Sequence, residues 1–242
     1  MYYHYILMFS DYEQGTRKAY YKTFVDVKEM RKFRDEIKQI KGDFRNVTFS
    51  SHQVMTNSET ISSVPEYDRY FEGVEFYSEK ELFERELGIS TEITPSDILK
   101  YVLIEKECTK LKAMKLIYLI YERYLKETGQ FLFKEDFLAW KLGPVSNSAY
   151  LKLSAYKYED IKLEDKELEK AKLKLKLDRA FDKDRIIRCM DNVIEEFGDL
   201  SPNDLVNLTH EKERPWYKVK KSVGLGHSIT KDVMLECALI NH

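Results

Sequence analysis

The most regular apolar pattern of the chain lies between positions 110 and 128. These apolar residues recur there at three- and four-residue steps: Leu111, Met114, Ile117, Tyr118, Tyr121 and Leu125. That spacing places side chains on one face of a helix. Leu116, Leu119 and Ile120 widen the face so far that little of the middle turns can meet water, which is typical of a buried helix. We predict a central helix that ends at Gly129, followed by a short extended segment and a Gly143-Pro144 turn into another helix.

The first ninety residues show a different pattern. Positions 2–9, 19–27, 44–55 and 73–77 are rich in aromatic and β-branched residues, which predicts four strands. Two helices are predicted beside them, one capped by Asp26 and one opened by Ser78 and Glu81 in a capping-box spacing and stopped at Gly88. The fold class predicted for the whole chain is α+β. Its first part, 1–92, is expected to be a small N-terminal α/β-type sandwich domain.

A sharp helix start marks the second part. Thr94-Pro95-Ser96-Asp97 combines an N-cap threonine, a proline at the first helical position and an acid two residues later. The same device returns at Ser201-Pro202-Asn203-Asp204, and Asp182 is placed to cap the helix between them. We therefore predict that 93–242 is a mostly α-helical domain with a short β segment.

The run from Lys157 to Arg185 mixes both signs of charge with regularly spaced leucines. One interpretation is a solvated connector with one amphipathic turn or strand. The other is a partner-docking segment, because such a run can fold against a second surface.

Composition narrows the classes of function. The 242 residues carry 40 basic and 42 acidic side chains, a net charge of -2. This balance argues against a broad phosphate-binding surface, so nucleic-acid binding is an alternative that we do not favour. The three cysteines are far apart in the sequence, which favours reduced thiols over a disulfide framework. No apolar run is long enough to cross a bilayer. We expect a cytoplasmic protein that does not enter the membrane.

No arrangement of residues in the sequence is typical of an enzyme. The histidines do not form H-E-x-x-H, the cysteines do not form C-x-x-C, and neither a G-x-S-x-G elbow nor a phosphate-binding glycine loop is present. We therefore expect no catalytic residues, no metal site and no cofactor.

Two separated motifs carry a resemblance to a known family. The first comprises Met114-Lys115-Leu116-Ile117-Tyr118, Gly129 and the segment from Phe137 to Val145, which reads F-L-A-W-K-L-G-P-V. The second is L-S-P-N-D-L-V-N-L-T-H, ending at His210, with Pro215-Trp216 after it. Together they resemble the SocA-like antitoxin domain, also called Panacea, from about residue 97 to the C-terminus. The N-terminal domain has no such resemblance.

The resemblance implies an antitoxin that binds a cognate toxin protein and holds it inactive without catalysis. The candidate partner-binding residues match or adjoin the motifs: Lys115, Asp136, Trp140, Gly143, Pro144, His210 and Trp216. Two rival functions stay open, a phage- or prophage-associated accessory protein that binds a host protein, and a nucleic-acid-binding regulator. A homo-oligomer is also left open.

Three of these candidates have a structural interpretation as well. Lys115 lies inside the apolar helix, where its ammonium either reaches solvent at the end of a packed stem or pairs with a buried acid such as Asp136. Trp140 is either a core residue or part of a groove. An imidazolium at His210 would meet the negative end of a helix dipole. The ring either bonds backbone carbonyls and fixes the turn toward Trp216, or lies at a partner surface.

Overall fold

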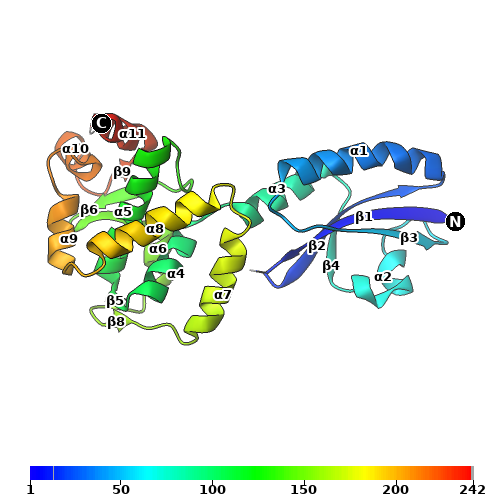
Figure 1. The fold of residues 1–242 in the computed structure, drawn as a ribbon, viewed down its shortest axis with the longest axis horizontal. Coiled ribbons are helices and arrows are strands. Elements are labelled where there is room, and N and C mark those ends of the chain that lie inside the picture. The colour runs from blue at the N-terminus through cyan, green and yellow to red at the C-terminus, as the bar shows by residue number, and fades with distance from the viewer. Residues whose placement is uncertain (13, 241–242) are drawn as a thin grey trace. The chain divides into compact units, whose positions relative to one another are not determined.

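The chain forms two compact units in the computed structural model, which describes residues 1–12 and 14–240 (Figure 1). Unit 1 comprises Met1–Glu92 and the short segment Asp178–Phe181. Unit 2 comprises Ile93–Leu177 and the chain from Asp182 onward. Unit 1 is built on a sheet and unit 2 is mostly helical, so the predicted α+β fold class is confirmed.

A four-stranded sheet forms the centre of unit 1. Its strands are β1 (Tyr2–Asp11), β2 (Thr16–Phe24), β3 (Ser50–Thr56) and β4 (Val74–Tyr77). They lie in the order β3-β1-β2-β4, with β1 antiparallel to both neighbours and β4 parallel to β2. Because successive side chains of a strand point to opposite faces, β1 contributes apolar residues to two cores.

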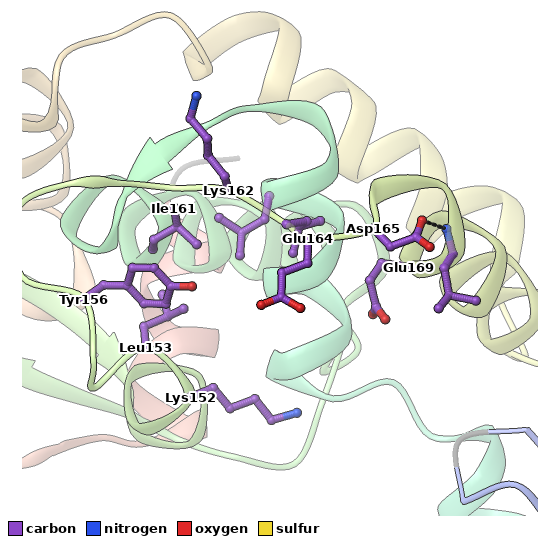
Figure 2. A pocket seen from close by; sticks show the side chains of 11 residues that line it. Lys152, Leu153, Tyr156, Ile161, Lys162, Glu164, Asp165 and Glu169 are labelled. Carbon is purple, nitrogen blue, oxygen red and sulfur yellow. Dashed lines mark hydrogen bonds between the residues drawn. The ribbon is translucent and has the colours of Figure 1, made fainter.

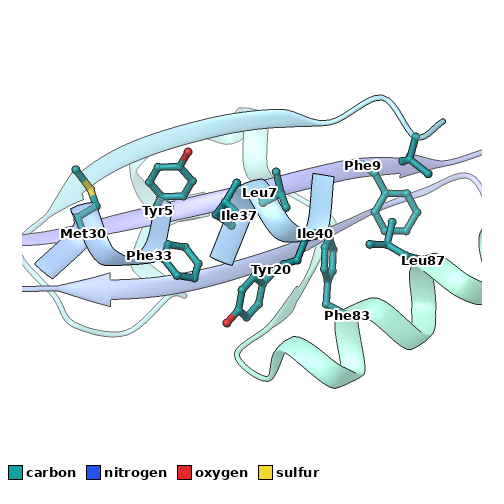
Figure 3. Packing of buried hydrophobic residues seen from close by; sticks show 11 residues of the cluster. Tyr5, Leu7, Phe9, Tyr20, Met30, Phe33, Ile37, Ile40, Phe83 and Leu87 are labelled. Atoms are coloured by element: carbon teal, nitrogen blue, oxygen red, sulfur yellow. The ribbon is translucent and has the colours of Figure 1, made fainter. Parts of the chain in front are cut away.

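Helices cover both faces of this sheet. On one face, α1 (Val27–Asp43) and α3 (Lys80–Thr91) enclose Tyr5, Leu7 and Phe9 of β1 (Figure 3). On the other face lie α2 (Ser63–Tyr67) and the short 3-10 helix η1 (Arg69–Phe71). There Val64 and Phe71 pack with Ile6.

The segment Asp178–Phe181 is held in unit 1 by hydrogen bonds to β1, to α3 and to the loop residue Asn46. The Arg179 guanidinium donates to the Ser10 carbonyl at 2.6 Å and to the Ser90 hydroxyl at 3.1 Å. The Asn46 amide donates to the Ala180 carbonyl at 3.0 Å. This small piece of the charged run is therefore an ordered part of unit 1.

Unit 2 is built around the predicted central helix, α5 (Lys110–Thr128). The other helices of the unit are α4 (Pro95–Glu105), α6 (Asn147–Lys152), α7 (Lys166–Leu177), α8 (Lys183–Phe197), α9 (Pro202–Thr209), α10 (Pro215–Ser222) and α11 (Lys231–Ile240). From Ala113 to Leu125 every residue of α5 is buried except Arg123. Helices α4, α8, α9 and α11 pack against it, as does strand β7.

Two small sheets complete unit 2. One pairs β5 (Cys108–Thr109) with β8 (Asp160–Ile161). The other has the order β7-β6-β9 and comprises β6 (Phe137–Trp140), β7 (Gly143–Ser146) and β9 (Ser228–Ile229). Gly143-Pro144 is therefore not a turn into a helix, as the sequence predicted. The turn is Lys141-Leu142, Gly143 begins a strand, and α6 follows at Asn147.

The proline-containing helix starts are confirmed. Thr94 and Asp97 form a reciprocal capping box at α4, and the Ser201 hydroxyl accepts from the Asp204 amide at α9. The predicted start at Ser78 is wrong, because Glu79 is the N-cap of α3 and its side chain makes no capping bond. Gly88 does not stop that helix, which continues to Thr91.

The charged run contains more structure than a solvated connector needs. It forms β8 and the twelve-residue helix α7, whose Leu173 and Leu177 are buried. Glu169 of α7 is paired with Lys100 of α4 at 2.9 Å. The leucine spacing therefore produced an amphipathic helix packed on its own unit.

Candidate functional site

Lys115 is a buried cation at the centre of the motif region. Its side chain has no exposed surface, and its ammonium donates to the Pro144 carbonyl at 2.9 Å. Burial lowers the pKa of the Lys115 ammonium to about 7, because a low-polarity environment disfavours the charged form. Neither expected arrangement holds. The ammonium does not reach solvent, and Asp136 instead accepts from the Ser228 hydroxyl at 3.1 Å.

Gly143 makes the approach of β7 to Lys115 sterically possible. Its φ of +107° lies where side chains are rarely tolerated. A Cβ at this position would lie 2.6 Å from the Lys115 Nζ atom and 3.0 Å from the Thr209 hydroxyl oxygen. Thr209 is itself buried at the end of α9 and donates to the Leu205 carbonyl. Both motifs therefore meet at this glycine.

The two tryptophans have different environments. Trp216 is 1% exposed, and its indole N–H donates to the Trp140 carbonyl at 2.8 Å. Trp140 is partly exposed, and its ring meets the Tyr150 ring edge-on at a centroid distance of 4.8 Å. Trp216 is thus a core residue that fixes the backbone of the β6–β7 hairpin, while the Trp140 side chain lies at the border between core and surface.

His210 is the C-cap of α9 and stacks flat on Trp216. The ring centroids are 3.5 Å apart and the planes differ by 6°. Burial, together with the positive charges of Lys115 and Lys220, lowers the pKa of His210 to about 4. The expected imidazolium is therefore wrong, since the ring is neutral near pH 7. The Nε2 atom is buried with no hydrogen-bond partner among the described residues, so stacking rather than a carbonyl bond from Nε2 fixes the turn toward Trp216.

A further ion pair, which the sequence motifs did not predict, ties the second motif to α5. Arg214, the N-cap residue of α10, pairs with Glu122, which is buried on α5. The Tyr118 hydroxyl also donates to Glu122, at 3.4 Å. A signal was present in the sequence, because Glu122 is an acid four residues from Tyr118 in an otherwise apolar helix, where a buried acid needs a cation.

A separate pocket of about 380 Å³ lies beside the charged run (Figure 2). Leu153, Tyr156 and Ile161 lie together at one end of it, and Asp165 and Glu169 lie at the other. One of them, Asp165, is occupied as a helix cap, since it accepts from the Leu168 amide at 2.9 Å. None of the seven candidate residues lines this pocket.

The structure thus brings six of the seven candidates into one assembly. The Lys115 ammonium donates to the Pro144 carbonyl, and Gly143 lies directly against the Lys115 side chain. The Trp216 indole donates to the Trp140 carbonyl, and the Trp216 ring stacks on His210. Asp136 lies apart from them, at the other end of β6 beside Ser228. Within residues 1–12 and 14–240 there is no cluster of three or more acids, histidines or cysteines that could hold a metal ion. No helix among these residues is both long and apolar enough to span a membrane.

Comparison with known proteins agrees with the sequence resemblance. No curated protein and no solved structure matches the chain. One family model does match, over a region that contains all seven candidates and the whole of α5 from Ala113, and that leaves out unit 1. The matching model, over residues 113–217, is that of the antitoxin SocA-like, Panacea domain family.

Proposed function

We propose that this protein is an antitoxin that neutralises a cognate toxin by binding it directly. The observation that carries the proposal is the match of residues 113–217 to the SocA-like domain, with both sequence motifs assembled around α5. Antitoxins of this kind act as protein partners, so the relevant property of unit 2 is the surface that its scaffold presents.

In this proposal most of the motif residues build the scaffold and do not touch the toxin. Lys115, Gly143, Pro144 and Trp216 are buried, and a toxin would reach them only if the domain opened. Toxin contacts therefore come from exposed residues that this scaffold positions. Interface energy is concentrated in a few well-placed side chains, and a rigid scaffold reduces the entropy lost on binding.

We further propose that the neutralisation is non-catalytic. The side chains with the strongest intrinsic reactivity support this. Burial raises the pKa of the Cys108 thiol to about 11 and of the Cys189 thiol to about 12, so both stay protonated and are poor nucleophiles near pH 7. All three cysteines are free thiols, which fits our proposal that this protein meets its toxin in the reducing cytoplasm.

Co-expression with each flanking open reading frame tests the proposal. We expect one neighbour to arrest growth when expressed alone and this chain to restore growth. A transcript of the same gene with an early stop codon is the control, because it separates the effect of the protein from that of its RNA. Arrest by neither neighbour, or rescue by the stop-codon transcript, would contradict the proposal.

A further inference from the structure

The end of the β6–β7 hairpin and the end of α10 expose a set of apolar and basic residues. We call this set the hairpin-tip surface, and its members are Lys141, Leu142, Lys220, Lys221, Val223 and Leu225. The three apolar side chains are 51%, 58% and 45% exposed, for Leu142, Val223 and Leu225 respectively. Single exposed leucines are ordinary, whereas several together mark a contact surface.

Backbone and ring contacts hold the two segments of this surface together. The Gly226 amide donates to the Ala139 carbonyl at 2.8 Å, and the Ala139 amide donates to the His227 carbonyl at 2.8 Å. These bonds place Leu225 beside the two-residue turn Lys141-Leu142. On the other side, the Lys220 ammonium lies 4.8 Å from the centroid of the Trp216 ring, whose indole bonds Trp140.

The surface has one sign of charge. The segments 139–143 and 219–227 contain three lysines and no acidic residue. Lys141 and Lys221 make no ion pair among the described residues, whereas nearby Lys218 is paired with Glu236 at 3.2 Å. In a protein whose net charge is -2, this is a local concentration of positive charge in segments that also expose apolar side chains.

We propose that the hairpin-tip surface is where this protein docks an acidic surface of its toxin. The inference rests on the proposed function and adds the location and the chemistry of the contact. Leucine and valine side chains fill pockets on a protein partner, and the lysines around them complement carboxylates and steer the encounter. Nucleic acid fits less well, because aliphatic side chains offer no ring on which a base can stack.

The scaffold explains why the motif residues matter for this contact without touching the toxin. The Trp216 indole holds the last residue of β6, and Gly143 allows the return strand to lie on Lys115. Together they fix the direction in which Lys141 and Leu142 project. A preorganised turn loses less entropy on binding than a mobile one.

A charge reversal that keeps the scaffold tests the location. The variant Lys141→Glu/Lys221→Glu leaves Lys220 over Trp216 and changes the net charge from -2 to -6, since each replacement subtracts two charges. The matched control is Lys170→Glu/Lys174→Glu, two exposed lysines of α7, which gives the same net charge. A third variant, Leu142→Ser, removes an apolar group at constant charge. Thermal unfolding of each variant checks that the fold is kept.

The probe is the purified product of the flanking open reading frame that arrests growth. We expect the tip variant to raise its dissociation constant about tenfold or more and to abolish growth rescue, with the control changing it less than about twofold. If Lys141→Glu/Lys221→Glu and the control lose the same affinity for the toxin, or if Lys141→Glu/Lys221→Glu keeps its affinity, the proposed location is wrong. Direct neutralisation at another surface would still stand. Lysine-dependent binding of a short DNA duplex in place of the toxin would overturn the acidic-protein assignment. If the wild-type chain rescues growth from neither neighbour, the proposed function fails, and this inference fails with it.

Discussion

Lys115 is an unfavourable residue for the core that contains it. Removing an ammonium from water costs several kcal/mol, and its hydrogen bond to the neutral Pro144 carbonyl offsets only part of that. The depressed pKa of about 7 expresses this imbalance. Between the folded pKa and the ordinary value near 10.5 the unfolded chain binds more protons, so this residue makes the protein more stable as the pH rises through that window.

Replacement of Lys115 by methionine removes this pH dependence. We expect the free energy of unfolding of the wild type, relative to Lys115→Met, to rise by about 2 kcal/mol between about pH 7 and about pH 9. Urea unfolding of both proteins at the two pH values measures it. Lys112→Met, at a partly exposed lysine of α5, is the control and should change the free energy of unfolding by less than about 0.5 kcal/mol. If the free energies of unfolding of the wild type and of Lys115→Met change in parallel with pH, burial does not disfavour the charged form of Lys115.

His210 makes the stability of the folded protein depend on pH in the acidic range. Its folded pKa of about 4 lies below the ordinary value of 6.5, so the unfolded chain binds more protons between them and stability is lost as the pH falls through that range. His210→Phe keeps an aromatic ring on Trp216 and cannot titrate. We expect the wild type to lose about 1 to 2 kcal/mol relative to His210→Phe between about pH 7 and about pH 5.

Chemical denaturation at the two pH values measures this loss. His227→Phe, at an exposed histidine of the same unit, serves as the control and should leave the free energy of unfolding within about 0.5 kcal/mol of the wild type. If wild type and His210→Phe lose equal stability on acidification, the His210 ring is not held neutral by its surroundings.

At the scale of elements, the β6–β7 hairpin depends on one glycine. Gly143→Ala would force a side chain into a backbone region that disfavours it and place a methyl group 2.6 Å from the buried Lys115 Nζ atom. The lysine cannot move aside because it has no exposed surface. We expect a loss of about 2 to 4 kcal/mol in the free energy of unfolding.

A second glycine separates backbone strain from the steric clash. Gly129 also has a positive φ, of +67°, but nothing lies within 4 Å of the point that a Cβ would occupy there. Gly129→Ala should therefore cost only about 1 to 2 kcal/mol. Thermal or urea unfolding compares the two variants, and equal losses would show that the contact with Lys115 does not restrict position 143.

Sequence alone predicted the elements whose signals are local. The helix starts at Thr94 and Ser201 and the central apolar helix followed from caps and periodicity that tertiary contacts did not override. The hairpin turn at Lys141-Leu142 was missed because Gly143-Pro144 reads as a turn, and only the pairing of β7 with β6 makes it a strand. The N-cap position of α3 is Glu79 rather than Ser78, a difference of one residue that capping preferences could not resolve.

The candidate site was predicted as a set of residues but not as an arrangement. The motifs singled out Lys115, Gly143, His210 and Trp216. In the structure Gly143 lies against Lys115, and His210 stacks on Trp216. Their depth could not be read from the sequence, because a lysine and a histidine normally indicate surface. The pairing of Glu122 with Arg214 joins residues distant in sequence, and the fold alone brings them together.

For the molecule as a whole, two properties frame the proposed function. Unit 1 has apolar cores on both faces of its sheet, and unit 2 contains the SocA-like domain match, so the scaffold of the proposed toxin contact lies in unit 2. The near-neutral net charge makes steering by the whole protein weak, which leaves local charge such as that of the hairpin tip to guide a partner.

Direct neutralisation is tested by titration calorimetry of the purified full-length chain with the purified product of the growth-arresting neighbour. We expect a stable complex with a defined stoichiometry, weakened by Lys141→Glu/Lys221→Glu and not by Lys170→Glu/Lys174→Glu. Growth rescue without any measurable complex would contradict direct neutralisation.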